Sequence, residues 1–179
     1  NYAQRLSGVA TQAARYVAAV SGTGVLLLDT RKTTPGWRDL EKYAVQCGGA
    51  RNHRHGLDDM VMIKDNHLAA LQGNNRITSA IERCREAHPD LKIEVEADTP
   101  IQARQAAESG ADIILLDNMT LDEIRESVTL INGRSQIEVS GGVTLDTIRD
   151  IAQTGVQYIS VGALTHSATS VDIALDFSL

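Results

Sequence analysis

The chain has 179 residues and a mass of 19.3 kDa, with 42% hydrophobic and 22% charged residues. These values are typical of one soluble domain with a buried core. The net charge of −6 argues against general nucleic-acid binding. No apolar run is long enough to span a bilayer, and the polar start with Arg5 is unlike a signal peptide. We expect a cytoplasmic protein that binds neither nucleic acid nor a membrane.

The chain begins with Asn1 inside a predicted helix over Tyr2 to Val20. We therefore expect residues 1–22 to be a leading helix that joins a missing N-terminal domain to a domain over residues 23–179. Cys47 and Cys84 fall in helical segments without metal-ligand spacing. Buried free thiols in a reducing compartment are the expected state, rather than a disulfide.

Six short apolar runs are typical of strands buried on both faces: Val25–Leu28, Met60–Ile63, Ile93–Val95, Ile113–Leu116, Ile137–Val139 and Tyr158–Val161. Helical periodicity lies between most of them, first over Arg76–His88 before Pro89. Thr99 and Pro100 start a further helix, Thr120 and Glu123 form a capping box, and Thr144 caps the last helix of this series. Alternating strands and helices with short links predict parallel strands.

Polar residues or glycines follow every predicted strand. They are Asp29-Thr30-Arg31-Lys32, Lys64-Asp65-Asn66, Glu96, Asp117-Asn118, Ser140-Gly141-Gly142 and Gly162-Ala163. The carboxyl ends of parallel strands build the active site of a (β/α) barrel. A doubly wound open sheet is the alternative, and it would split these residues across a switch point. The pattern favours an α/β protein with a (β/α) barrel.

Cations are concentrated near the first two strand ends, at Arg31, Lys32, His53, Arg54 and Lys64. Such a cluster in an acidic chain indicates a site for multiply charged anions, because guanidinium groups bind carboxylate and phosphate bidentately. The alternative is a set of surface charges paired with Asp58, Asp59 and Asp65.

Glu96 and Asp117 each end a buried strand, where an unpaired carboxylate would be costly. We expect each to have a cation or hydroxyl partner, the alternative being a structural ion pair. Glu94 is set aside, because we expect its side chain to point away from the face that Glu96 occupies.

The glycine-containing ends of the last two strands predict a phosphate site. Backbone N–H groups after the last strands of a barrel commonly bind phosphate, and glycine lets the backbone approach closely. His166 is either a further donor or a surface side chain, and His67 either starts a helix or takes part in catalysis.

The stretch from Leu27 to Leu68, LLDTRKTTPGWRDLEKYAVQCGGARNHRHGLDDMVMIKDNHL, closely resembles the signature region of quinolinate phosphoribosyltransferases. The resemblance continues through QRLSGVAT, IEVEADT, ILLDNMT, IEVSGGVTLDTI and ISVGALTHS, and so covers essentially the whole chain. It implies a barrel with fewer than eight strands that lacks the family's N-terminal α/β sandwich domain. It also implies a homodimer with an active site shared between subunits.

The resemblance implies phosphoribosyl transfer from phosphoribosyl pyrophosphate to quinolinate with decarboxylation, giving nicotinate mononucleotide. By motif, Thr30, Arg31, His53, Arg54 and Lys64 would bind quinolinate. The donor would contact Lys32, Glu96, Asp117, Ser140, Gly141, Gly142, Gly162, Ala163 and His166. Glu96 and Asp117 would also hold Mg²⁺, directly or through substrate or water, and Lys32, Lys64, Glu96 and Asp117 would be catalytic.

Other functions are open at this point. A paralogous group linked to molybdenum transport lacks the Lys-Asp-Asn-His run found at 64–67, and a nicotinate phosphoribosyltransferase would not require so many cations. A class I aldolase would use Lys64 as a Schiff-base lysine. A non-catalytic anion-binding domain is the fourth possibility.

Overall fold

Six parallel strands form one sheet in the computed structural model, which describes residues 1–73 and 75–177. The strands are β1 (Leu26–Leu28), β2 (Val61–Ile63), β3 (Ile93–Ala97), β4 (Ile113–Asp117), β5 (Gln136–Ser140) and β6 (Tyr158–Ser160). Each lies within two residues of the bounds predicted from its apolar run. The buried strands are rich in Ile, Leu and Val, as expected for a parallel sheet covered on both faces.

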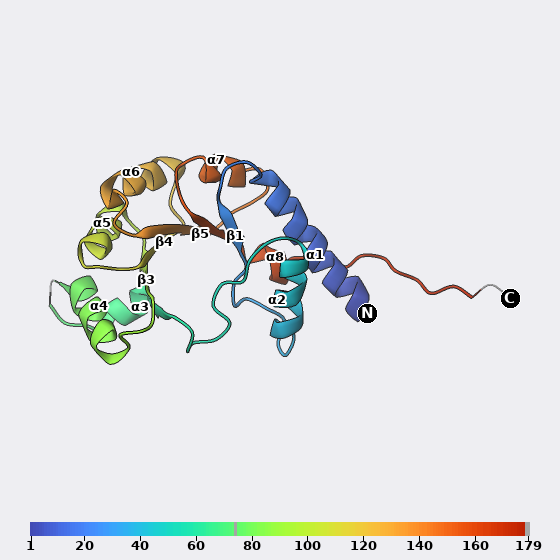
Figure 1. The fold of residues 1–179 in the computed structure, drawn as a ribbon, viewed down its shortest axis with the longest axis horizontal. Coiled ribbons are helices and arrows are strands. Elements are labelled where there is room, and N and C mark those ends of the chain that lie inside the picture. The colour runs from blue at the N-terminus through green and yellow to red at the C-terminus, as the bar shows by residue number, and fades with distance from the viewer. Residues whose placement is uncertain (74, 178–179) are drawn as a thin grey trace.

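The strand order is β1-β6-β5-β4-β3-β2, so the chain adds its strands in one direction without a reversal. A doubly wound sheet needs such a reversal, and that alternative is therefore wrong. Helices lie around the outside of the curved sheet (Figure 1). Within the described residues β1 and β2 do not pair with each other, although an isolated bridge joins Leu28 to Arg51. The fold is a partial (β/α) barrel with fewer than eight strands, as predicted.

Eight helices are described: α1 (Tyr2–Ala19), α2 (Arg38–Cys47), α3 (Asp65–Ala69), α4 (Arg76–Ala87), α5 (Pro100–Glu108), α6 (Leu121–Ile131), α7 (Ile148–Ala152) and α8 (Ala163–His166). The predicted caps of α5 and α6 are confirmed, because Thr99 accepts from Gln102 N–H and Thr120 forms a capping box with Glu123. The helix expected after Thr144 begins only at Ile148, because a turn occupies residues 145–147.

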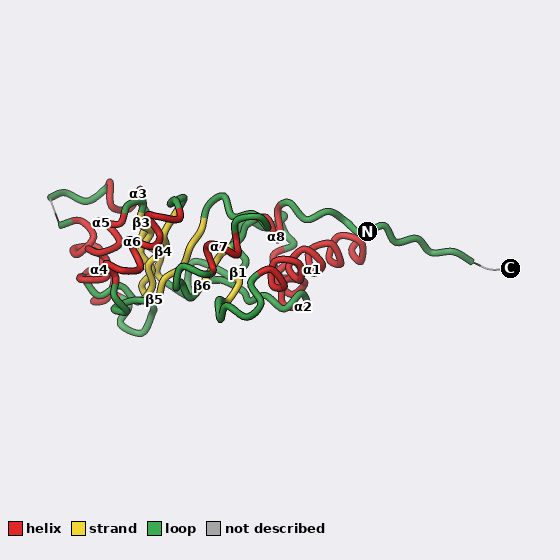
Figure 2. Tube along the Cα trace, turned by 90° about the horizontal axis from the view of Figure 1, so that it is seen from above, coloured by secondary structure: helices red, strands yellow, loops and turns green. Residues whose placement is uncertain are grey.

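Helix α1 packs against α2, α7 and α8, and it buries Val9, Ala13 and Tyr16 in the common core. The division of the chain at residue 22 stays a prediction. The segment after α8 runs outward from the fold (Figures 1 and 2). No helix in the described part of the chain is long and apolar enough to cross a membrane.

Both cysteines are free, as expected, but their expected burial is wrong. Cys47 is exposed at the end of α2 and Cys84 is half-buried on α4. A helix repeats every 3.6 residues, so a position one step off the buried stripe faces solvent whatever its polarity.

Candidate active site

The polar residues after the six strands meet at one edge of the sheet, because all six strands are parallel. The segment after β1 supplies Thr30, Arg31 and Lys32. Close beside it runs the chain from Arg51 to Arg54, which is hydrogen-bonded to the end of β1 through Asp29 N–H and Leu27 C=O. The structure thus brings together two cationic segments that lie about twenty residues apart in sequence.

Arg31 and Arg54 have no carboxylate in salt-bridge contact among residues 1–73 and 75–177. The buried Nε of Arg31 has no hydrogen-bond partner, and Arg54 Nη2 contacts only the sulfur of Met62, at 3.2 Å. Burial and the neighbouring charge of Arg31 lower the pKa of Arg54. The two guanidinium groups repel each other, while Glu94 and Asp59 attract Arg54 from beyond salt-bridge distance. Because neither guanidinium is paired directly with a carboxylate among the described residues, this region suits an anion. Neither arginine forms a salt bridge with Asp58, Asp59 or Asp65 in the described part of the chain, although Asp59 attracts Arg54 at longer range.

Lys32 lies beside the end of β6. Thr165 Oγ1 on α8 donates to Lys32 C=O at 2.8 Å, which ties the two segments together. A side chain at Gly162 would come within 3.4 Å of Lys32 Cδ and 3.0 Å of His166 Nε2. The predicted phosphate ligands Lys32, Gly162, Ala163 and His166 are therefore neighbours, and Gly162 leaves the space between them open.

Asp117 and the Ser140-Gly141-Gly142 loop are joined through Asn118. Asn118 N–H donates to Ser140 C=O at 3.0 Å, and its side-chain amide donates to Asp117 Oδ2 at 2.7 Å. A Cβ on Gly141 would lie 2.2 Å from Asn118 Oδ1, and Gly141 also has a φ of +90°. Only glycine fits here, so the predicted donor-binding residues of β4 and β5 form one rigid corner.

Lys64 and Glu96, which sequence reasoning assigned to different substrates, form an ion pair with each other across β2 and β3. His67 Nδ1 accepts the Lys64 N–H at 3.0 Å, so His67 takes the helix-start role at α3. Lys64, predicted to bind quinolinate, and Glu96, predicted to hold the metal, are thus neighbours.

His53 faces two buried carboxylates. Its Nε2 lies 3.4 Å from Glu94 Oε2 and 3.3 Å from Glu138 Oε2, and both glutamates are essentially without exposed surface. Setting Glu94 aside was wrong. Side chains two residues apart on a strand point to the same face, so Glu94 shares the inner face with Glu96. Glu138 on β5 was missed for the same reason, being two residues before Ser140.

The pKa of His53 reflects three opposing effects. Burial lowers it, but the hydrogen bonds and charges of Glu138 and Glu94 raise it to about 10. Against this, Nδ1 accepts the N–H of Arg54 at 2.7 Å, which a ring protonated on both nitrogens could not do. The pKa of His53 is raised because two buried carboxylates require a counter-charge. A small rotation of the ring relaxes its contact with the N–H of Arg54. Burial likewise raises the pKa of Glu94.

Among the described residues, the His53, Glu94 and Glu138 side chains are one group whose donor atoms could in principle surround a metal ion. Nε2 carries the ring proton in either state, because Nδ1 accepts a hydrogen bond in one and is protonated in the other. Nε2 therefore has no lone pair for a metal. Glu96 and Asp117 offer only carboxylate oxygens at the ends of adjacent strands. That donor set fits Mg²⁺, which takes one or two carboxylates and completes its shell with phosphates and water.

Three charged residues near the site, Arg38, Glu41 and Lys42, were missed in the sequence, and Asp29 was noted only as a strand-end residue. Glu41 is fully buried and accepts from Arg5 and from Thr34, in the loop after Lys32. A signal existed. Arg38, Glu41 and Lys42 follow the spacing of an inward helix face that continues to the buried Val45, so charges stand where helix periodicity predicts core.

The pH dependence of stability should reveal the His53 cluster. Because its folded-state pKa lies above the usual 6.5, its stabilisation is full below pH 6.5 and is lost as pH rises through about 10. We expect His53→Gln to flatten the fall in stability between about pH 6 and about pH 9.5. Urea unfolding at several pH values measures the free energy of unfolding of each variant. His55→Gln is the control, since His55 is exposed. An equally steep fall in both variants would contradict the assignment.

Comparison with known proteins agrees with the resemblance of the sequence. The family model described as quinolinate phosphoribosyl transferase, C-terminal domain, matches residues 9–176. A probable nicotinate-nucleotide pyrophosphorylase [carboxylating] of Bacillus subtilis is 46% identical over the whole chain. The chloroplastic protein of that name from Arabidopsis thaliana is 43% identical over 98% of the chain. The chain spans 61% and 54% of the length of these two relatives.

Solved structures agree in fold as well. NadC from Streptococcus pyogenes superposes with a TM-score of 0.90 at 46% identity, covering 96% of this chain and 60% of that one. A nicotinate-nucleotide pyrophosphorylase from Ehrlichia chaffeensis gives 0.92 at 45% identity, covering 97% and 62%. With a family model that covers nearly all of its barrel, this chain belongs to the quinolinate phosphoribosyltransferase C-terminal domain family.

Proposed function

We propose that the protein transfers the phosphoribosyl group of phosphoribosyl pyrophosphate to quinolinate, with loss of CO₂, as a decarboxylating pentosyltransferase of pyridine nucleotide synthesis. The observation that carries the proposal is the pair of guanidinium groups, Arg31 and Arg54, neither of which is in salt-bridge contact with a carboxylate of the described residues. A substrate with two neighbouring carboxylates supplies the missing charge. The names of the relatives support the same reaction.

Two clusters divide the substrates between them. Quinolinate would lie against Arg31 and Arg54, with Thr30, His53 and Lys64 around it. The donor would place its 5′-phosphate at the glycines after β5 and β6, and its pyrophosphate near Lys32. Guanidinium forks suit carboxylates, whereas backbone N–H groups beside glycine suit phosphate.

The proposed chemistry needs no covalent nucleophile from the protein. The pyridine nitrogen forms a bond to C1 of the ribose as the bond from C1 to the pyrophosphate oxygen breaks. The ring then carries a positive charge and accepts the electron pair of the bond to the 2-carboxylate as CO₂ leaves. A proton replaces it on the ring carbon. Arg31 and Arg54 orient the ring, and Lys32 offsets charge on the leaving group.

Mg²⁺ is part of the proposal. Glu96 and Asp117 would hold it beside the donor, where a bound Mg²⁺ ion neutralises charge on the pyrophosphate. Glu96 is paired with Lys64 and Asp117 with the Asn118 amide. Each carboxylate therefore keeps an oxygen free for the metal or for the ribose hydroxyls.

The aldolase alternative loses support from the same geometry. A Schiff-base lysine must be a neutral amine to attack a carbonyl. Lys64 instead forms an ion pair with Glu96.

Substrate charge tests the proposal directly. Losing one partner of a hydrogen-bonded charge pair costs about 2–5 kcal/mol, so Arg54→Ala should weaken quinolinate binding at least about tenfold. Titration calorimetry measures it, with Arg125→Ala as control because Arg125 pairs with Asp122 on the exposed face of α6. Wild-type protein that binds nicotinate and quinolinate equally would overturn the substrate assignment.

The metal assignment predicts a different pattern for Asp117→Asn. The variant should lower kcat by about a hundredfold and raise the Mg²⁺ concentration needed for turnover. Quinolinate affinity without donor should stay within about twofold, because Asp117 is assigned to the donor side. Asp122→Asn, a few residues further and fully exposed on α6, is the control. A large loss of quinolinate binding in Asp117→Asn would show that the two substrates have been exchanged.

We also propose a cytoplasmic homodimer whose active site is shared between subunits, as the family resemblance implies. Leu57 provides a place to test it, because this large apolar side chain is 71% exposed in the loop that follows Arg54. Leu57→Glu should shift sedimentation toward the monomer and lower quinolinate turnover. Ile101→Glu, 60% exposed on α5, should change neither. A wild-type protein that sediments as a fully active monomer would refute the shared site.

A further inference from the structure

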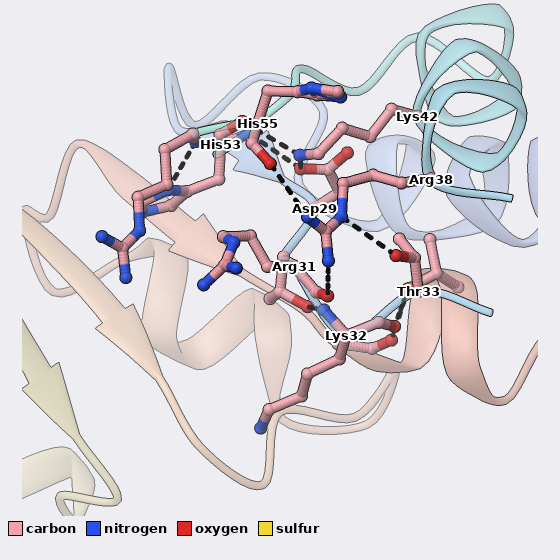
Figure 3. A network of polar contacts seen from close by, with 12 residues as sticks. Asp29, Arg31, Lys32, Thr33, Arg38, Lys42, His53 and His55 are labelled. Atoms are coloured by element: carbon pink, nitrogen blue, oxygen red, sulfur yellow. Dashed lines mark hydrogen bonds and ion pairs between the residues drawn. The ribbon is translucent and has the colours of Figure 1, made fainter. Parts of the chain in front are cut away.

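Helix α2 presents two cations, Arg38 and Lys42, to the segments that carry the substrate arginines. They lie one helical turn apart and face the same side of α2. Neither binds a carboxylate at the surface. Arg38 donates to the C=O groups of Arg31 and His55, and Lys42 donates to the C=O of His53 (Figure 3).

Lys42 acts together with Asp29, the residue directly after β1. The two form a buried ion pair, with Lys42 Nζ 2.6 Å from Asp29 Oδ1. Asp29 Oδ1 also accepts the N–H of His53 at 2.8 Å, while Lys42 Nζ donates to the C=O of His53 at 3.0 Å. With its amide nitrogen turned toward Asp29, Asn52 donates to the second carboxylate oxygen at 2.9 Å. One ion pair therefore holds both peptide groups of His53.

Arg38 spans the same two segments further out. Its Nη2 donates to Arg31 C=O and its Nη1 to His55 C=O, both at 3.3 Å, and its Nε donates to Thr33 Oγ1 at 3.2 Å. The planar guanidinium fork fixes these directions relative to one another. The backbone of Arg31 is thereby linked to the residue that follows Arg54.

We propose that Asp29, Arg38 and Lys42 form a clamp that sets the separation of Arg31 and Arg54 and so selects a substrate with two adjacent carboxylates. They act as positioning residues, since none of them is assigned to a substrate. The inference rests on the proposed function, because it explains how that site discriminates quinolinate from a pyridine with one carboxylate.

A purely stabilising role explains the Asp29–Lys42 ion pair less well than a positioning role does. A buried ion pair is often replaceable by apolar residues without loss, because desolvation offsets its attraction. Burial indeed raises the pKa of Asp29 despite the Lys42 partner. The geometry of the backbone contacts explains why a charged pair occupies this place.

Charge-balanced variants separate the two accounts. Lys42→Met and Asp29→Asn should each destabilise the protein, because each leaves one buried charge unpaired. The double variant removes both charges and should recover most of the stability. Its KM for quinolinate should remain raised at least about tenfold, with KM for the donor within about twofold, because the contact to His53 C=O is still missing. Its preference for quinolinate over nicotinate should fall by a similar factor.

Arg38→Met is a second, milder variant, since Arg38 is only half-buried and the methionine keeps most of the stem. We expect a several-fold rise in KM for quinolinate with little change in the unfolding midpoint, and partial recovery in Arg38→Lys. Deuterium exchange should quicken in residues 51–55 in all these variants, but not in the strand over Ile93–Ala97.

A matched control lies at the opposite end of the barrel. Arg85 binds Asp112 at 2.8 Å, Asp112 accepts the Ile93 N–H, and Arg85 also donates to Leu91 C=O. Arg85→Met with Asp112→Asn should alter stability without altering KM. A double clamp variant whose quinolinate KM recovers with its stability would overturn the clamp while leaving the proposed function intact. A wild-type protein that does not turn over quinolinate would instead overturn the function.

Discussion

Four carboxylates lie inside this protein almost without contact with water: Asp29, Glu41, Glu94 and Glu138. Burying a charge is tolerable only when a counter-charge and hydrogen bonds accompany it. Lys42, Arg5 and His53 supply the counter-charges, although both buried oxygens of Glu94 lack a well-aligned hydrogen-bond partner within the described residues. Each of these cations is drawn from a segment far away in sequence, so satisfying the carboxylates also fixes how α1, α2 and the chain around His53 lie against the strands.

The same requirement explains which cations remain available to a substrate. Lys42 and Arg5 form ion pairs with buried carboxylates, and Lys64 forms an ion pair with Glu96. Arg31 and Arg54 have no such partner among the described residues. The sequence shows a cluster of cationic residues near the first two strand ends. Only the packing of the folded chain shows which of them form internal ion pairs and which remain available to an anion.

Strand positions, barrel class and two helix caps could be predicted because they depend on short-range patterns. A buried parallel strand is a continuous apolar run, and Thr99 and Thr120 act within their own helix turns. The pairing of Lys64 with Glu96 depends on the neighbouring register of β2 and β3, which no local pattern shows. Glu94 could have been predicted, since alternation along β3 places it on the face of Glu96.

Position matters more than total charge for a site of this kind. The chain carries a net charge of −6, which at long range opposes an anionic substrate. Salt screens exposed charges beyond about 8 Å at physiological ionic strength, so only cations within roughly that distance contribute strongly to capture. Two guanidinium groups at a fixed separation can match two carboxylates of one rigid ring, whereas the same groups on mobile segments would lose that match to conformational entropy. An acidic barrel can therefore bind dianions selectively once buried pairs such as Asp29 and Lys42 hold the backbone beneath its free arginines.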